Sequence, residues 1–163
     1  KNGLVITHYN NHPNIVKEET NYVMGNKFGK SKITLKNGDI IEENYFMNKL
    51  YEPSNCVKGD CINGYGEIDI MDGDVTYKGG FRNGLPHGKG ILGGFEMKIF
   101  YDGEWVNGYF NGYGKYNNDN LEIYEGKFFI NLYDGIGKLI TKNSAGEIEK
   151  IEEGKFDLGH FIG

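Results

Sequence analysis

Aromatic and glycine residues occupy every second position in the middle of the chain. Tyr77, Gly79 and Phe81 alternate in this way, so they lie on one face of a predicted strand. The dipeptide Asn83-Gly84 follows directly, and it is a strong signal for a two-residue hairpin turn. The expected return strand carries glycine and leucine on one face, at Gly88, Gly90 and Leu92. The pattern therefore predicts an antiparallel β-hairpin.

The same hairpin pattern recurs twice, first after 24 residues and then after 23. The second unit has Tyr101, Gly103, Trp105, Gly108, Gly112 and Gly114. The third has Tyr124, Gly126, Phe128, Asn131, Gly135 and Gly137. Asn131 replaces a turn glycine there, and asparagine tolerates positive φ. We expect the hairpins to stack into one long meander, in which the strand glycines leave room for the rings of adjacent strands.

Fainter units extend the repeat in both directions. A fourth is expected at Gly154, Phe156, Gly159 and Gly163, with Glu152 in the tyrosine position. Degenerate units are expected near the N-terminus, with Tyr22, Gly25, Gly29 and Phe46 in aromatic and glycine positions. We therefore divide the chain into an irregular N-terminal β region, residues 1–63, and one continuous array of clear repeats, residues 64–163. Phe161 and Ile162 form a capping strand, or further repeats or another domain follow Gly163.

Composition agrees with a β-rich, turn-rich chain. Glycine accounts for 26 of the 163 residues, and tyrosine, phenylalanine and tryptophan for 12, 10 and one. Strong helix formers such as alanine are scarce, which excludes a helical bundle. The abundance of aromatic residues argues against a disordered chain. The three prolines exclude collagen.

The repeated pattern resembles the MORN repeat (membrane occupation and recognition nexus). The three units that carry the resemblance read YKGGFRNGLPHGKG, YDGEWVNGYFNGYG and YEGKFFINLYDGIG. Departures from the pattern occur at Asn131, at Glu152 and in the irregular stretch from Leu50 to Cys61. The resemblance implies an all-β fold, an elongated and curled single antiparallel sheet of stacked hairpins with a groove.

No constellation of residues indicates catalysis, a cofactor or a metal. The serines lie away from any histidine in the sequence, and the Gly-x-Gly pairs recur as part of the repeat without a following P-loop lysine. Cys56 and Cys61 are too few for a disulfide framework and lack zinc-site spacing, so we interpret them as ordinary loop cysteines. We expect a protein that is not an enzyme.

Charge limits the classes of partner. The formal net charge is −5, which argues against nucleic-acid binding. Residues 64–163 hold ten lysines and arginines against sixteen acidic residues, and this balance disfavours anionic membranes. Lys115 and Lys138 share one repeat position, but Ile91 and Glu67 interrupt that basic row.

The remaining candidate function is protein binding. We predict a partner-binding surface at Tyr65, Tyr109, Phe110, Tyr113 and Ile136, because exposed aromatic side chains are typical interface anchors. Tyr109 and Phe110 are expected in a hairpin loop. These residues either bind a partner or cover the core of the sheet itself. The acidic balance favours an amphipathic helix with basic residues beside its apolar ones, lying in the groove.

Two other functions stay open at this point. The array could be a regulatory or substrate-positioning part of a larger enzyme, such as a lysine methyltransferase or a lipid kinase, or a module that associates with phospholipids. We expect a cytoplasmic protein, with the cytoskeleton or a membrane as sites of association. Exposed sheet edges make oligomerisation a further expectation.

Overall fold

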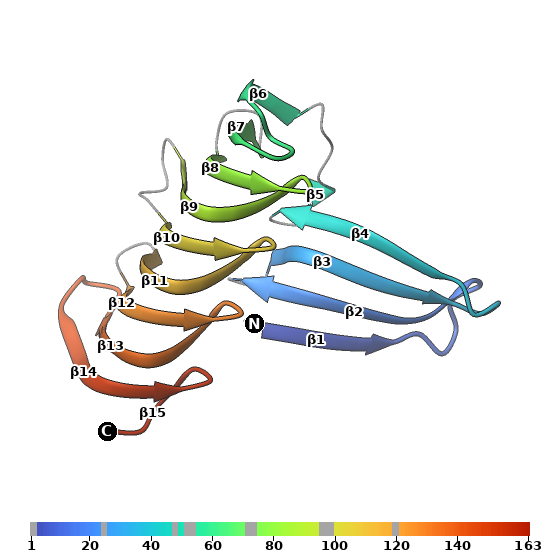
Figure 1. Cartoon of the computed structure of the whole chain (residues 1–163). Helices are drawn as coiled ribbons and strands as arrows, with labels where there is room; N and C mark the ends of the chain where they lie inside the picture. The colour runs from blue at the N-terminus through green and yellow to red at the C-terminus, as the bar shows by residue number, and fades with distance from the viewer. Residues whose placement is uncertain are drawn as a thin grey trace. The chain divides into compact units, whose positions relative to one another are not determined.

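The computed structural model describes residues 3–23, 26–46, 49–50, 55–70, 75–94, 100–118 and 121–163. The described residues form antiparallel strands and no α-helix, which confirms the predicted all-β fold of hairpins. They divide into two compact units, Lys1–Glu52 and Pro53–Gly163. Each unit holds one sheet, of five and ten strands respectively, where the resemblance implied a single sheet (Figure 1). The predicted position of Gly25 lies outside the described residues.

The first unit is a five-stranded antiparallel meander. Its strands follow one another in chain order: β1 (Gly3–His8), β2 (Ile15–Val23), β3 (Asn26–Leu35), β4 (Ile40–Phe46) and β5 (Lys49–Leu50). Opposed positions on β2 and β3 carry polar side chains, such as Thr20 and Ser31, where the repeats of the second unit have paired glycines. The opposed side chains at the middle of the strands therefore differ between the two sheets.

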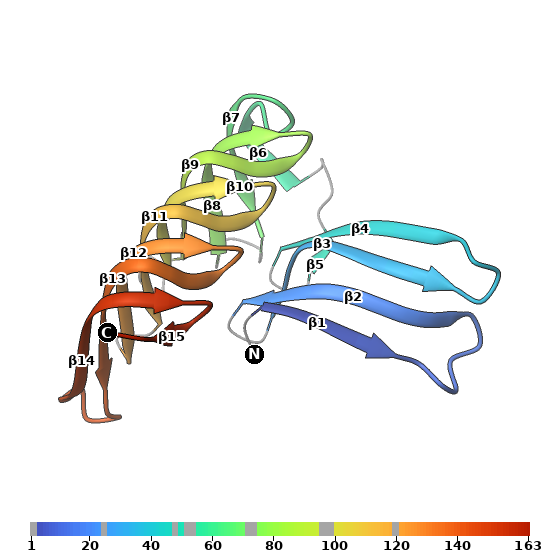
Figure 2. The same cartoon turned by 60° about the horizontal axis from the view of Figure 1, so that its bottom comes forward.

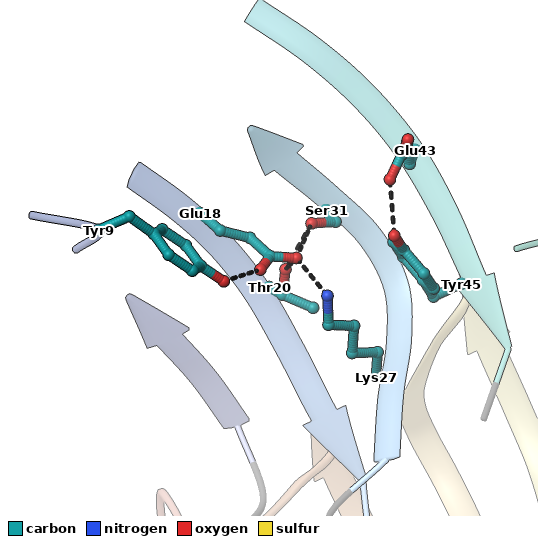
Figure 3. A network of polar contacts seen from close by, with 7 residues as sticks. All are labelled: Tyr9, Glu18, Thr20, Lys27, Ser31, Glu43 and Tyr45. Carbon is teal, nitrogen blue, oxygen red and sulfur yellow. Dashed lines mark hydrogen bonds and ion pairs between the residues drawn. The ribbon is translucent and has the colours of Figure 1, made fainter. Parts of the chain in front are cut away.

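A buried carboxylate organises the polar centre of the first unit. The Glu18 carboxylate accepts hydrogen bonds from Tyr9 (2.9 Å), Thr20 (3.0 Å), Lys27 (2.6 Å) and Ser31 (3.0 Å). The hydroxyl oxygens of Thr20 and Ser31 also contact each other. Figure 3 shows these side chains converging on Glu18 from the end of β1 and from β2 and β3. Every partner needed by the buried charge is therefore supplied within the sheet.

The cluster continues towards β4 through the Lys27 ammonium group. Lys27 Nζ lies 4.8 Å from the centre of the Tyr45 ring, and Tyr45 donates a 2.6 Å hydrogen bond to Glu43 (Figure 3). Burial alone would raise the pKa of Glu18, but the hydrogen bonds from Lys27, Tyr9 and the two hydroxyls hold that pKa below its ordinary value. Glu18 is therefore ionised in the folded unit at neutral pH.

The second unit is a ten-stranded meander of bent, stacked hairpins (Figure 2). Its strands are β6 (Cys56–Gly59), β7 (Tyr65–Asp69), β8 (Val75–Arg82), β9 (Leu85–Gly94), β10 (Tyr101–Val106), β11 (Tyr109–Asn118), β12 (Glu122–Phe129), β13 (Leu132–Lys142), β14 (Ile148–Asp157) and β15 (His160–Phe161). The hairpin β6–β7 spans the expected boundary between residues 63 and 64. The repeat pattern thus produces one strand pair for each unit of sequence.

Glycines oppose each other at the middle of every repeated hairpin. The pairs are Gly79 with Gly90, Gly103 with Gly114, and Gly126 with Gly137. A tyrosine ring covers each pair. A Cβ atom added at Gly114 would lie 2.6 Å from Cζ of Tyr101, for example. The glycines are therefore required by the rings above them, as the sequence predicts.

The rings form one continuous edge-to-face series through the unit. Tyr77 contacts Trp105 of the next hairpin, with ring centroids 5.0 Å apart, and Tyr101 contacts Phe128 in the same way at 5.1 Å. Each repeated tyrosine also donates a hydrogen bond from its hydroxyl to a nearby backbone carbonyl, which is Lys127 O for Tyr124. Burial raises the pKa of Tyr124 to about 12. We call this buried side of the sheet the aromatic face.

The hairpin turns require positive φ at both central residues. Asn83 and Gly84 have φ of 51° and 74°, and Asn107 has φ of 50°, which confirms the predicted Asn-Gly turns. The third turn holds Ile130 and Asn131, at 47° and 63°. Asn131 is buried there. Its N–H donates to Phe110 O, and its Oδ1 accepts a 2.7 Å bond from Phe110 N. The asparagine therefore ties neighbouring hairpins together.

Candidate partner-binding face

Three of the predicted binding residues lie on the side of the sheet opposite the aromatic face. Tyr65 on β7, Tyr113 on β11 and Ile136 on β13 are 63%, 58% and 62% exposed. Each stands one position before a glycine of the covered row, so the alternation of a strand turns it away from the tyrosine rings. We call this side the open face. It carries large apolar side chains that the sheet does not cover.

Lysines lie beside these apolar residues. Tyr113 is directly opposite Lys127 on β12, and Ile136 is opposite Lys155 on β14. Lys127 Nζ lies 5.8 Å from the centre of the Tyr113 ring. Lys89 is opposite Glu104 in the same row, and Glu104 accepts a 3.4 Å hydrogen bond from the backbone N–H of Tyr113. The row therefore alternates apolar anchors with long charged side chains.

A second row on the open face crosses nine strands and alternates in charge except at Ile91. Its members in spatial order are Lys58, Glu67, Lys78, Ile91, Asp102, Lys115, Glu125, Lys138 and Glu153. Lys138 and Glu153 form an ion pair of 2.8 Å, and Lys115 and Glu125 approach to 3.6 Å. The lysines at the shared repeat position are thus interleaved with acids. We call this row the charge ladder.

Two hollows lie along the charge ladder. The larger, of about 700 Å³, is lined by Tyr113, Ile136 and the ladder residues between them. The smaller, of about 240 Å³, is lined by Tyr65, Lys58, Glu67 and Lys78. Glycines of the covered row also line both hollows: Gly114, Gly126 and Gly137 the larger, and Gly59 and Gly66 the smaller. The repeat therefore places an exposed tyrosine over a hollow at two points of the sheet.

The sequence model of the MORN repeat matches residues 77–93, 101–120 and 124–145. These segments contain the hairpins whose opposed glycines lie under tyrosine rings. These three segments are MORN repeats. No curated protein matches the chain in sequence. The degenerate N-terminal MORN units stay a prediction, because the matched segments begin at residue 77.

The prediction of an exposed Phe110 is wrong. Phe110 lies in β11 rather than in a loop, is 1% exposed, and stacks on the Tyr101 ring with centroids 3.8 Å apart. Tyr109 is half-buried at the start of the same strand. The signal was present in the repeat, since Tyr133 occupies the position of Phe110 in the next unit and stacks on Tyr124 at 3.9 Å. Phe110 belongs to the core of the MORN array.

The interpretation of the two cysteines as ordinary loop residues is also wrong. Cys56 and Cys61 form a disulfide with Cα atoms 5.9 Å apart. The chain reverses between them because Gly59 has φ of 80° and Asp60 accepts hydrogen bonds from the N–H groups of Ile62 and Asn63. Disulfides persist mainly in oxidising compartments, and the cytoplasmic setting stays a prediction.

Within the described part of the chain, no group of three or more histidine, cysteine, aspartate or glutamate side chains is placed to hold a metal ion. No helix of sufficient length and apolarity to cross a membrane occurs among the same residues.

Proposed function

We propose that the MORN array is a non-enzymatic scaffold that binds a protein segment across its open face. The observation that carries this proposal is the placement of Tyr65, Tyr113 and Ile136, which stand exposed on β7, β11 and β13 beside hollows. Aromatic anchors next to a concavity are the usual centre of a protein interface. Phe110 takes no part, since it is buried in the core.

The spacing of the anchors fits an amphipathic helix that lies across the strands. Tyr113 and Ile136 are two strands apart, which corresponds to about 9.6 Å at the usual strand separation. A helix advances about 10.5 Å over seven residues, so apolar side chains seven positions apart would reach both anchors. Tyr65 lies four strands from Tyr113. It would therefore meet the same helix about two further seven-residue repeats along.

The net charge of the chain and the charges on the open face both bear on the charge of the partner. The net charge of −5 attracts a basic segment over long distances. At the surface itself, the charge ladder presents acids and lysines in alternation, and Lys127 and Lys155 stand beside the anchors. A partner helix with basic residues next to its apolar stripe is therefore steered by the whole array and meets Asp102, Glu125 and Glu153 on arrival.

A displayed library of helical and unstructured peptides of about 20 residues tests the proposal. We expect the selected peptides to be apolar at positions seven apart and to gain helical circular dichroism when bound. The triple variant Tyr65→Ala/Tyr113→Ala/Ile136→Ala should bind them at least about tenfold more weakly. The matched control is Leu4→Ala/Ile6→Ala/Leu158→Ala, which removes equally exposed side chains that are not on the open face. Equal binding by both triple variants would refute the proposal.

Phospholipid association is the alternative function, and the row of Lys89, Lys127 and Lys155 favours it. Each lysine near an anionic surface contributes about 1 kcal/mol. Sedimentation with phosphatidylserine vesicles at low and physiological salt tests this alternative. Binding that is lost in Lys89→Glu/Lys127→Glu/Lys155→Glu but kept in the anchor triple variant would favour lipid over protein as the ligand of the open face.

A further inference from the structure

A disulfide takes the place of a tyrosine ring in the hairpin β6–β7. Gly66 stands 24 residues before Gly90, one repeat earlier, and lies opposite Gly79 in the covered row. A Cβ atom added at Gly90 would lie 2.5 Å from Cζ of Tyr77, whereas one added at Gly66 would lie 2.7 Å from Sγ of Cys61. The sulfur of Cys61 therefore covers Gly66 as the rings cover the later glycines.

β6 reaches the aromatic face through one side chain. A register shift within the strand places Cys56 opposite the buried Ile68, and Lys58 opposite Glu67 of the charge ladder. The other three residues of β6 are exposed, and Val57 is 61% exposed. In the part of the chain that the structure describes, β7 is the one strand beside β6 (Figure 1). The bond from Cys56 to Cys61 is thus the link between β6 and the buried side of the sheet.

The two sulfurs of this bond differ in their access to solvent. Cys56 is half-buried, whereas Cys61 is 3% exposed. Thiol–disulfide exchange starts with attack of a thiolate on a sulfur that it can reach, which here is Cys56 Sγ. The bond between the cysteines then breaks, and Cys61 leaves as a thiolate that takes up a proton. The second thiol of a dithiol reductant displaces Cys56, so the reductant becomes a disulfide and the protein gains two thiols.

The turn after β6 is tied to the next hairpin independently of the disulfide. Ile62 O accepts a 2.9 Å hydrogen bond from Gly84 N, and Gly64 O accepts a 2.7 Å bond from Phe81 N. These bonds hold the buried Cys61 in place when the disulfide is reduced. β6 has no apolar side chain besides Cys56 to hold it there. Reduction therefore loosens β6 and leaves the turn and β7 attached.

The smaller hollow of the open face depends on β6. Lys58 and Gly59 of β6 line it together with Tyr65, Gly66 and residues of β7 and β8. Loss of β6 removes this side of the hollow. The larger hollow is lined by residues of β10–β14 and stays complete.

We propose that the Cys56–Cys61 disulfide is a redox-controlled clasp. A dithiol reductant opens it, releases β6 from β7 and dismantles the hollow beside Tyr65. Oxidising compartments keep the clasp closed and reducing ones open it. Release of β6 follows from the contacts of the second unit alone. Its effect on a partner rests on the proposed function of the open face.

Amide hydrogen exchange of the full chain, with and without dithiothreitol, tests release of β6. The amides of residues 56–60 include the Asp60 N–H that donates to Tyr65 O at 3.0 Å. They should exchange at least about tenfold faster after reduction. The Ile70 N–H, which donates to Val75 O just beyond β7, should be unchanged. A disulfide that dithiothreitol leaves intact in the folded chain, or equal exchange of residues 56–60 in both states, would overturn the proposal.

A permanently open clasp is obtained with Cys56→Ser, which leaves Cys61 over Gly66. Its exchange should match that of the reduced chain and should not respond to dithiothreitol. Val57→Ser is the matched control, because it changes an exposed side chain of the same strand and keeps the disulfide. It should respond to reduction as the unaltered chain does. The clasp is ruled out if Cys56→Ser exchanges as slowly as the oxidised chain.

Two synthetic helical peptides test the effect on the open face. One has about 22 residues, with leucine at every seventh position and lysines between, and spans Ile136, Tyr113 and Tyr65. The other has about 15 residues and spans Ile136 and Tyr113 without reaching Tyr65. Reduction should weaken binding of the longer peptide about fivefold and leave that of the shorter one unchanged.

The two measurements separate the clasp from the open-face proposal. If neither peptide binds the oxidised chain, the open-face proposal fails, and amide exchange still decides whether the clasp exists. If the longer peptide binds the oxidised and reduced chains equally, the clasp does not regulate the open face.

Discussion

The five-stranded sheet buries polar groups at its centre, whereas the ten-stranded sheet buries aromatic rings over glycine. In the first, Glu18 is 6% exposed and Thr20 and Ser31 are buried beside it. In the second, Tyr77, Tyr101 and Trp105 are at most 1% exposed. Both sheets are antiparallel meanders, so their topology does not decide how they are held together.

The two sheets differ in what stabilises them: packing of apolar surface in the second, and a hydrogen-bonded carboxylate in the first. A tyrosine over paired glycines is stabilised by contact area, which changes little with pH or salt in the neutral range. A carboxylate held by four donors is stabilised only while each partner keeps its protonation state and position. The two units should therefore respond differently to truncation, to acid and to alkali.

The largest effect is expected for Trp105→Ala. Trp105 contacts rings of its own and the neighbouring hairpins and donates a 2.9 Å hydrogen bond to Gly90 O. Loss of a fully buried tryptophan costs about 3–5 kcal/mol. Urea unfolding monitored by circular dichroism measures the loss, and amide hydrogen exchange locates it in β8–β13. Trp105→Phe is the control, because Phe81 and Phe128 occupy the same repeat position, and it should retain most of the stability.

The corresponding experiment on the first unit is Glu18→Ala. This change leaves Lys27 without its 2.6 Å partner and removes the acceptor of Tyr9, Thr20 and Ser31. We expect a loss of about 2–3 kcal/mol, because buried donors lose their acceptor together. Glu19→Ala removes a surface ion pair with Lys17 and should cost much less than Glu18→Ala. Equal effects of the two changes would show that the Glu18 cluster adds no stability.

Acid should affect the first unit through Glu18. Its folded-state pKa is lowered, so its contribution is present above the ordinary carboxyl pKa and is lost as pH falls through the folded value. The free energy of opening measured by amide exchange in β2 and β3 should therefore fall as the pH drops below the ordinary carboxyl pKa of about 4. Glu18→Gln should flatten that dependence. A dependence that is unchanged in Glu18→Gln would assign the acid response to other carboxylates.

Alkali should affect the second unit through its buried tyrosines. The folded-state pKa of Tyr124 is raised to about 12, so its stabilising contribution is present below the ordinary tyrosine pKa of about 10 and is lost as pH rises towards 12. Spectrophotometric titration at the tyrosinate band should show Tyr124 ionising only as the hairpins open. Tyr124→Phe should remove this part of the alkaline dependence, although it also removes the hydrogen bond to Lys127 O.

The second sheet could be predicted from the sequence because its structure repeats. Tyr77, Gly79, Phe81 and Asn83-Gly84 each report a local requirement, and the recurrence of the set confirms the strand pairs. Exposure of Tyr113 and Ile136 followed from the same alternation. The prediction for Phe110 fails because it extends the hairpin loop beyond the turn, whereas β11 begins at Tyr109 and includes Phe110.

The first sheet could not be predicted to the same depth. Glu18, Thr20 and Ser31 are polar residues in strands, and their pattern in the sequence gives no sign that they are buried together. Their contacts join residues up to 13 positions apart through strand register, which no local signal fixes. The Cys56–Cys61 disulfide was missed for a related reason, since a single pair of cysteines has no spacing pattern to support it.

The smallest effect is expected in the turn between β12 and β13. Ile130 has φ of 47°, a conformation that β-branched residues rarely adopt and that asparagine tolerates. The corresponding residues of the two preceding turns are Asn83 and Asn107. Ile130→Asn should therefore stabilise the second unit by about 0.5–1 kcal/mol, measured as an increased urea midpoint with an unchanged slope. The reverse change, Asn107→Ile, should destabilise by a similar amount. If both changes are destabilising, the packing of the Ile130 side chain stabilises the turn by more than its backbone strain destabilises it. The third repeat would then tolerate isoleucine at this position because of that packing.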